Sequence, residues 1–267
     1  MKIALIQFDT LWEDKTSNLK KVAHFIETLP DDVELVVLPE MFSTGFTMNP
    51  SKVAEFKNGE TLERIQKLAT AHQLAITGSW VIEENENFYN TLFFVYPDGS
   101  YKTYNKRHLF TLAGEDKVYT AGNEKLIVNY KGWNICPLVC YDLRFPVHSR
   151  IVNQNYDVLL YVASWPDKRI YAWDSLLKAR AIENMSYVVG VNRCGTDPNG
   201  VYYSGHSQAL DYMGQYLQEP LEKEAVKIIT IAKEPLEKAR TKLAFLNDAD
   251  IFEIKYNETL SVNEGRV

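Results

Sequence analysis

Three separated segments of the chain carry side chains suited to covalent hydrolysis. Cys140 ends the apolar run 135–139 and precedes a polar turn; a nucleophile at such a strand-to-helix turn is exposed and has backbone N–H groups nearby. Glu40 follows the hydrophobic segment 36–38 and a proline, so a carboxylate stands at the carboxyl end of a strand, where α/β proteins bind ligands. Lys106 lies in a long irregular stretch of polar and aromatic residues, of the kind that often lines a site. A thiol, a carboxylate and an ammonium group could serve as nucleophile, proton carrier and electrostatic stabiliser in covalent catalysis.

Each of these residues also has an ordinary structural interpretation. A glutamate after a strand is commonly a solvated loop residue, a lysine commonly lies on the surface, and a cysteine is commonly a small core residue. The alternation of Cys136, Leu138 and Cys140 permits a core position for both cysteines, and we adopt it for Cys136. For Cys140, a neighbouring positive charge would lower the pKa of the thiol and favour the thiolate. The three segments therefore have to be interpreted together.

The composition is that of a globular enzyme. The chain has 267 residues, 46% hydrophobic and 24% charged, and its three cysteines have no paired spacing. The net charge of −6 argues against nucleic acid as a partner. No apolar run approaches the ~20 residues that a membrane span needs, and the first residues do not form a signal peptide. We therefore predict a cytoplasmic enzyme that binds neither nucleic acid nor membrane.

Strands and helices alternate along the chain, without an internal repeat or a flexible linker. This alternation predicts a single α/β (α+β) domain over residues 1–235. The remaining segment, 236–267, has few core-like residues and is expected to be a C-terminal extension, either partly disordered or packed on a neighbouring subunit. The predicted strands are 2–8, 34–38, 74–81, 89–96, 101–104, 133–139, 157–162, 187–192, 207–211, 215–218 and 226–231. The predicted helices are 18–29, 62–72, 173–184, one beginning near Pro146 and a short charged one from about Pro235.

In the order Glu, Lys, Cys, the three segments resemble the nitrilase (carbon–nitrogen hydrolase) superfamily over residues 1–235. Within it the chain resembles the omega-amidase branch, which hydrolyses the terminal amide of 2-oxo acid amides such as 2-oxoglutaramate. Relatives often carry an acidic residue in place of Val147 and Asp in place of His206. The first departure is expected to affect packing near the cysteine, and the second leaves the substrate preference open. The resemblance rests on Leu38-Pro39-Glu40, Asn105-Lys106-Arg107-His108-Leu109 and Cys140-Tyr141-Asp142-Leu143-Arg144-Phe145-Pro146, and for the branch on 163–166, 173–184, 191–195 and 203–207.

The resemblance implies a role for each of these residues. Cys140 attacks the amide carbonyl and forms a thioester. Glu40 takes the thiol proton, passes it to the departing ammonia and then activates the water that hydrolyses the thioester. Lys106 stabilises the tetrahedral intermediate as a point charge, together with the backbone N–H of Tyr141. Glu115 is implied as a second glutamate that orients the lysine and the substrate amide; the alternative is a surface position in its loop.

A 2-oxo acid also needs a cation or N–H donors for its carboxylate. Arg144 is the candidate, with Lys168 and Arg169 as other available cations. The structural alternative for Arg144 is an ion pair with Asp142 or another acid. The predicted substrate-binding residues are Phe42, Arg144 and Trp165, with Tyr141 as a further wall.

The fold that the resemblance implies is a four-layer αββα sandwich, in which two sheets pack face to face with helices outside. It also implies a homodimer that pairs through its helical layers. No cofactor or metal is expected, since the chemistry needs none and the histidines show no ligand spacing with the cysteines. Two other functions stay open: an amidase or carbamoylase of the same superfamily with the same triad, and a noncatalytic interaction protein on this fold. The second is disfavoured because an inactive site has no need of all three residues.

Overall fold

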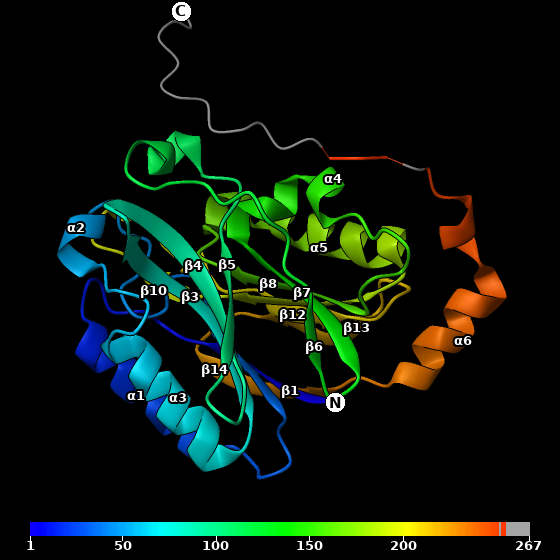
Figure 1. Cartoon of the computed structure of the whole chain (residues 1–267), viewed down its shortest axis with the longest axis horizontal. Coiled ribbons are helices and arrows are strands. Elements are labelled where there is room, and N and C mark those ends of the chain that lie inside the picture. The colour runs from blue at the N-terminus through cyan, green and yellow to red at the C-terminus, as the bar shows by residue number, and fades with distance from the viewer. Residues whose placement is uncertain (251, 255–267) are drawn as a thin grey trace, which may run out of the picture.

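The computed structural model describes residues 1–250 and 252–254 (Figure 1). The strands are β1 (Lys2–Gln7), β2 (Leu35–Val37), β3 (Ala75–Glu84), β4 (Asn87–Val95), β5 (Tyr101–Asn105), β6 (Val128–Tyr130), β7 (Trp133–Val139), β8 (Val158–Ala163), β9 (Tyr187–Asn192), β10 (Cys194–Thr196), β11 (Tyr202–Ser204), β12 (Ser207–Leu210), β13 (Tyr216–Leu221) and β14 (Ala225–Thr230). The α-helices are α1 (Lys15–Glu27), α2 (Pro50–Val53), α3 (Glu60–His72), α4 (Pro146–Ser149), α5 (Ile170–Asn184) and α6 (Lys233–Leu243).

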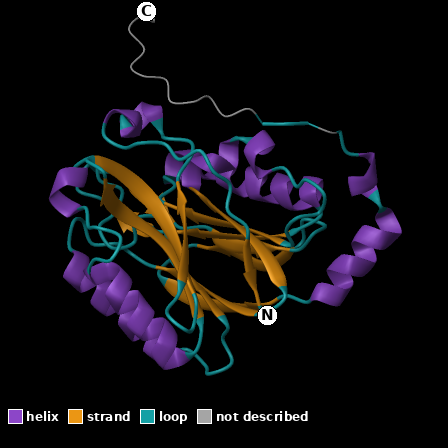
Figure 2. Cartoon of the chain, viewed as in Figure 1, coloured by secondary structure: helices purple, strands orange, loops and turns teal. Residues whose placement is uncertain are grey.

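Two six-stranded sheets pack face to face between layers of helices. The first has the strand order β14-β1-β2-β3-β4-β5 and the second β13-β12-β9-β8-β7-β6. In each sheet three consecutive central strands run parallel: β1, β2 and β3 in the first, and β7, β8 and β9 in the second. Helices α1 and α3 cover the outer face of the first sheet, and α4 and α5 lie on the side of the second (Figure 2). The predicted αββα sandwich is confirmed. No helix in the described part of the chain is long and apolar enough to cross a membrane.

The alternating side chains of the central strands explain why both faces of the first sheet are covered. In β1, Ile3 and Leu5 join the cluster between the sheets, whereas Ala4 and Ile6 join the cluster beneath the helices. Successive strand residues point to opposite faces, so a strand that is apolar throughout must be buried on both sides.

Most predicted elements are present, with shifted ends. Helix α1 begins three residues before the predicted start, because the side chain of Asp14 caps it by accepting a hydrogen bond from the N–H of Ser17 at 3.0 Å. Strands β6, β10 and β11 were not predicted. Each has only three residues, too few to show a hydrophobic period.

The predicted boundary between residues 235 and 236 falls inside helix α6. Leu236 is fully buried and belongs to a core cluster that also includes residues of both sheets and of α5. Arg240 donates from Nε to the carbonyl of Met185 at 2.9 Å and lies 3.4 Å from the carboxylate of Asp157. The helix therefore packs with the domain, and the extension begins after it. Packing of the tail on another subunit stays a prediction, since residues 251 and 255–267 lie outside the described residues.

Candidate active site

Loops that follow strands of both sheets bring Glu40, Lys106 and Cys140 together. Glu40 comes three residues after β2, Lys106 directly follows β5, and Cys140 directly follows β7. All three are buried, with Cys140 retaining 9% exposure. The backbone also joins the two sheets here, because the N–H of Glu40 donates to the carbonyl of Ala163, at the end of β8, at 3.4 Å. The structure thus gathers the predicted triad at one edge of the sandwich.

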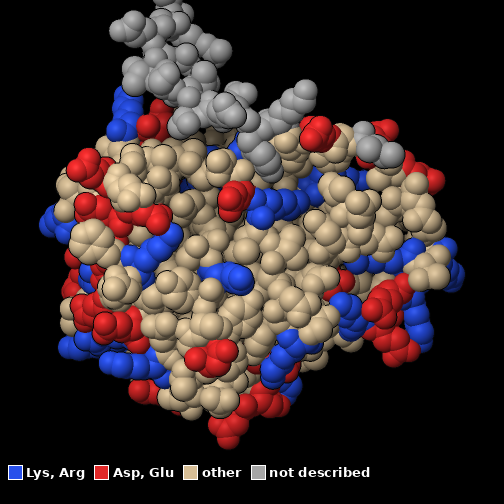
Figure 3. All heavy atoms as spheres, viewed as in Figure 1, with Lys and Arg blue, Asp and Glu red and all other residues tan. Residues whose placement is uncertain are grey.

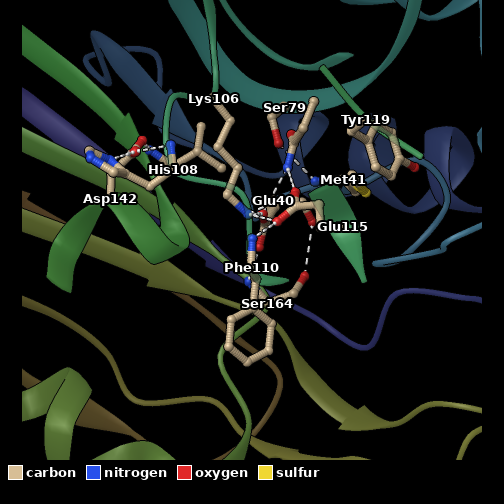
Figure 4. A network of polar contacts seen from close by, with 12 residues as sticks. Glu40, Met41, Ser79, Lys106, His108, Phe110, Glu115, Tyr119, Asp142 and Ser164 are labelled. Carbon is tan, nitrogen blue, oxygen red and sulfur yellow. Dashed lines mark hydrogen bonds and ion pairs between the residues drawn. The ribbon is translucent and has the colours of Figure 1, made fainter. Parts of the chain in front are cut away.

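Lys106 lies between two carboxylates. Its Nζ is 2.9 Å from Oε1 of Glu40 and 2.9 and 2.8 Å from the two oxygens of Glu115 (Figure 4). Burial by itself lowers the pKa of Lys106, but the charges of Glu115 and Glu40 raise it, and the result lies above the usual lysine value. The lysine is therefore a permanent cation. Glu115 is fully buried here, so its alternative position on the loop surface is ruled out.

The two glutamates are fixed by further hydrogen bonds. Oε2 of Glu115 accepts from the backbone N–H of Phe110 at 2.6 Å. In Glu40, Oε1 accepts from Nδ2 of Asn90 at 2.8 Å, and Oε2 accepts from the N–H of Ser164 at 2.9 Å. Burial raises the pKa of Glu115, the lysine charge opposes that rise, and the charge of Glu40 adds to it, leaving the pKa above its usual value. Both carboxylates are held in a single orientation before any substrate arrives.

Cys140 occupies a strained backbone turn. Its φ is +43°, in the left-handed region that residues other than glycine seldom adopt. The residue begins the 3₁₀ helix Cys140–Arg144 directly after β7. Such a turn presents the side chain at the end of the strand, and the first N–H groups of a helix have no partner within it. The N–H of Tyr141 is placed at this helix start, as an oxyanion donor must be.

Opposing influences set the pKa of the Cys140 thiol. Burial raises its pKa, and the charge of Glu40 and a hydrogen bond to Glu40 raise it further. The charge of Lys106 lowers it, as expected, but the pKa remains well above the usual cysteine value. The expected lowering by a neighbouring positive charge is therefore present, but burial and Glu40 outweigh it. A hydrogen bond between the nucleophile and a carboxylate is the arrangement that general-base catalysis requires.

A cavity of about 570 Å³ opens onto the triad. Cys140 and Lys106 lie in its wall, with the predicted residues Arg144 and Trp165. The guanidinium of Arg144 lies 4.9 Å from the centroid of the Trp165 ring, a cation–π contact that leaves its N–H donors free for a ligand. Other side chains in the wall include Tyr141, Phe110, Lys168, Arg169 and Tyr203.

One expected pocket residue and one structural alternative are not seen. Phe42 does not line the cavity: it is fully buried beneath the helices of the first sheet, with its ring edge-on to Trp80 at 5.7 Å. The alternative ion pair between Arg144 and Asp142 is absent from the described residues, because Asp142 is occupied by other donors, among them the ring of His108 at 2.8 Å.

The remaining singled-out positions lie outside the cavity wall. Cys136 is completely buried, and burial raises the pKa of its thiol to about 12, which agrees with its core position. Val147 is 57% exposed, so its expected effect on packing near the cysteine is not seen. His206 has φ +64°, and its Nδ1 lies 2.9 Å from a carboxylate oxygen of Asp174 at the start of α5. Among the described residues, no group of three or more His, Cys, Asp and Glu side chains is arranged to hold a metal ion.

Sequence reasoning missed two groups that hold Glu40. Asn90 lies inside the predicted strand of a hairpin, where a lone amide looks like any polar residue. The N–H of Ser164 belongs to a segment recognised only as a branch marker. Asn90 reaches Glu40 from another strand of the same sheet and Ser164 from the second sheet, and local patterns carry no signal for contacts between such distant segments.

Comparison with known proteins agrees with this geometry. The sequence model of the carbon-nitrogen hydrolase family matches residues 2–241. The chain belongs to the carbon–nitrogen hydrolase family. This hydrolase is 39% identical to the omega-amidase YafV of Yersinia enterocolitica, over 94% of this chain and 98% of that one. It is 34% identical to the 2-oxoglutaramate amidase of Bacillus subtilis, over 81% and 85% of the two chains.

A solved structure is also similar to this hydrolase. A CN-hydrolase superfamily protein of Xanthomonas campestris, with an arsenic adduct in its active site, superimposes with a TM-score of 0.94. Its sequence is 39% identical, and the match covers 96% of this chain and 99% of that one. The resemblance predicted from the three motifs is confirmed.

Proposed function

We propose that this carbon–nitrogen hydrolase is an omega-amidase, which cleaves the terminal amide of small 2-oxo acid amides such as 2-oxoglutaramate to release ammonia. The observation that carries the proposal is a single cavity whose wall holds Cys140 and Lys106 of the triad together with an arginine, Arg144, without a carboxylate partner in the described residues. The names of the relatives from Yersinia enterocolitica and Bacillus subtilis support the same substrate class.

The geometry supports acylation of Cys140 with Glu40 as the base. As the sulfur attacks the amide carbon, its proton moves to the carboxylate to which the thiol is bonded. The carbonyl oxygen becomes an oxyanion, which the Nζ of Lys106 and the N–H of Tyr141 stabilise. Glu40 then donates the proton to the nitrogen, the C–N bond breaks, and ammonia leaves a thioester on Cys140.

The second half of the reaction uses the same groups. Glu40 removes a proton from water, the resulting hydroxide attacks the thioester, and the same oxyanion donors stabilise the intermediate. Collapse releases the carboxylic acid and returns the proton to the sulfur. Because Glu115 and Asn90 hold the lysine and the glutamate in place throughout, little reorganisation is needed between the two halves.

Arg144 is the group proposed to select the substrate. Its planar guanidinium presents paired N–H donors that match a carboxylate, and charge-assisted bonds of this kind are stronger than neutral ones. Lys168 and Arg169 add positive charge to the same wall. An amide whose other end is a 2-oxo acid would be anchored there, whereas an uncharged aliphatic amide would not.

A substrate panel tests this assignment. Ammonia release is measured with 2-oxoglutaramate, with an uncharged aliphatic amide and with an N-carbamoyl amino acid, each with wild type and Arg144→Met. We expect 2-oxoglutaramate to be preferred, and we expect the variant to raise its KM by about 10- to 100-fold, the loss of one bond to a charged group. A preference for the uncharged or carbamoyl compound would instead assign the protein to another amidase or carbamoylase of the family.

We also propose a homodimer that pairs through the helical layer around α5. Tyr171 and Ile182 are both exposed on this helix, and residues eleven apart lie on one face. Ile182 lies against Gly214, and the neighbouring Met213 is exposed as well. Exposed apolar side chains gathered on one helix and the adjacent turn commonly mark an interface. Sedimentation of Ile182→Asp beside wild type tests it: a monomeric variant supports the interface, and an unchanged dimer excludes it.

The cellular setting follows the expectations from composition. We propose a cytoplasmic location, for which the free thiols of Cys136, Cys140 and Cys194 are suited, because reducing compartments keep thiols unpaired. We propose no nucleic-acid partner, since the net charge is −6 and acidic side chains are interspersed among the basic ones on the face in Figure 3.

A further inference from the structure

One buried carboxylate beside the site has no part in the reaction described above. Asp142 is fully buried and accepts four hydrogen bonds. Its Oδ1 accepts from the backbone N–H of His108 at 3.0 Å and lies 2.8 Å from Nδ1 of the same residue (Figure 4). Its Oδ2 accepts from the backbone N–H of Val139 at 3.0 Å and from the hydroxyl of Tyr104 at 2.8 Å. One side chain therefore joins two separate catalytic segments.

The bonded residues flank the nucleophile and the lysine. Val139 directly precedes Cys140, while Tyr104 and His108 stand two residues before and after Lys106. We propose that Asp142 is a positioning residue that sets the separation of the Lys106 ammonium and the Cys140 thiol by tying their two loops to one carboxylate. The proposal rests on the roles given to these two groups under the proposed function.

The chemistry of the four bonds requires an ionised carboxylate. Burial raises the pKa of Asp142, but the hydrogen bond and the charge of His108 lower it, and the result lies below the usual aspartate value. A carboxylate only accepts, so Nδ1 of His108 must carry the hydrogen. The ring is held in that orientation by stacking on Phe145, at a centroid distance of 3.8 Å and an interplanar angle of 6°.

The hydrogen bonds of Asp142 extend to the backbone next to Lys106. The hydroxyl that donates to Asp142 also accepts from the N–H of Arg107 at 3.3 Å. The same hydroxyl lies 3.1 Å from Nε2 of His148. The turn that carries Lys106 is therefore bonded to Asp142 directly through residue 108 and indirectly through the hydroxyl of Tyr104. A side chain with fewer acceptor oxygens than a carboxylate cannot accept all of these hydrogen bonds.

Asparagine in place of Asp142 must break one of the ties. Its side chain has a single acceptor oxygen, and its amide N–H₂ would face a backbone N–H, either that of Val139 or that of His108. Either outcome releases one loop from the other. A displacement of about 1 Å between catalytic groups typically lowers the rate about 100-fold.

The test compares Asp142→Asn with a matched control, Asp157→Asn. Asp157 is also a buried carboxylate that accepts a backbone N–H, that of Asn134 at 2.9 Å, and it binds Lys233 at 2.7 Å. It lines a different cavity, beside α6. For folded protein, we expect Asp142→Asn to lower kcat for ammonia release about 100-fold with KM changed only a few-fold. The control should lower the unfolding temperature and leave kcat unchanged.

A second readout needs no substrate. The rate at which iodoacetamide alkylates Cys140 is measured against pH in wild type and in Asp142→Asn. Because the charge of Lys106 lowers the pKa of this thiol, displacing the lysine should move the alkylation profile to higher pH. This shift is expected even if 2-oxoglutaramate proves not to be the substrate, so failure of the proposed function is distinguished from failure of this inference.

A folded Asp142→Asn variant with wild-type kcat and a wild-type alkylation profile would overturn the proposal. If that variant does not fold, Tyr104→Phe takes its place, since it keeps a buried ring and removes only the hydroxyl bonds. We expect kcat for Tyr104→Phe to fall up to about tenfold, as the loss of one hydrogen bond allows. A wild-type kcat in folded Tyr104→Phe would equally count against the tie.

Discussion

Replacing Lys106 by methionine tests the charge arrangement on which the site depends. Methionine keeps an unbranched apolar chain but leaves Glu40 and Glu115 fully buried without the cation that lies 2.8–2.9 Å from both. Removing one partner from a buried ion pair typically costs about 3–5 kcal/mol. In a chain of this size, each kcal/mol lowers the unfolding temperature by about 2–4 °C, so we expect a fall of about 6–20 °C.

The pH dependence of this loss follows from the pKa of Glu115. Burial already raises that pKa, and Lys106 opposes the rise, so the variant raises it further. When the pKa of a carboxyl is higher in the folded state than in the unfolded state, the free energy of unfolding is larger at low pH, where the carboxyl is protonated. This stability is lost as the pH rises through the folded pKa. The deficit of Lys106→Met should therefore be smaller at pH 5 than at pH 8.

The assay is calorimetric unfolding at both pH values, with ammonia release measured on the same samples. Adding Glu115→Gln to Lys106→Met should restore part of the stability at pH 8, because only one uncompensated buried carboxylate then remains. Activity should fall by about 10²–10³, the usual effect of removing an oxyanion stabiliser. If Lys106→Met unfolded at the wild-type temperature at both pH values, the two carboxylates would not depend on Lys106, and the reasoning would be refuted.

Two further substitutions separate the functions of other groups. Glu40→Gln should abolish ammonia release. It should also speed alkylation of Cys140 by iodoacetamide at neutral pH, because Glu40 raises the pKa of the thiol and Lys106 lowers it. Slower alkylation would show that Glu40 does not raise the pKa of the thiol. Leu236→Ala should lower the free energy of unfolding in urea by about 2–5 kcal/mol, as for other buried leucines, and leave kcat unchanged. A wild-type free energy of unfolding would show that α6 does not pack with the domain.

The sequence predicts well those features that depend on local pattern. The apolar runs of β7 and β9 predicted both strands with the bounds that the structure shows. Cys140 was placed correctly at a strand-to-helix turn because the change from apolar to polar residues is visible in the sequence. Patterns within one segment were therefore enough to predict these strands and the turn that carries Cys140.

Features that depend on contact between segments were predicted less well. Phe42 follows Glu40 by two residues, and the sequence does not show that its ring packs on Trp80 in the core instead of facing the ligand. The sequence indicated only that a positive charge would lower the pKa of Cys140; it does not show that burial and a carboxylate one hundred residues away raise that pKa further. Asp142 was considered only as a partner for Arg144, although its four bonds join two loops.

The most direct test of the proposed chemistry is ammonia release from 2-oxoglutaramate by wild type and Cys140→Ala, measured side by side on protein shown to be folded. We expect steady release by wild type and none from the variant, with equal unfolding temperatures within a few degrees. Release that persisted in Cys140→Ala would contradict a thioester on this residue. No release from folded wild type whose Cys140 still reacts with iodoacetamide would contradict the omega-amidase assignment.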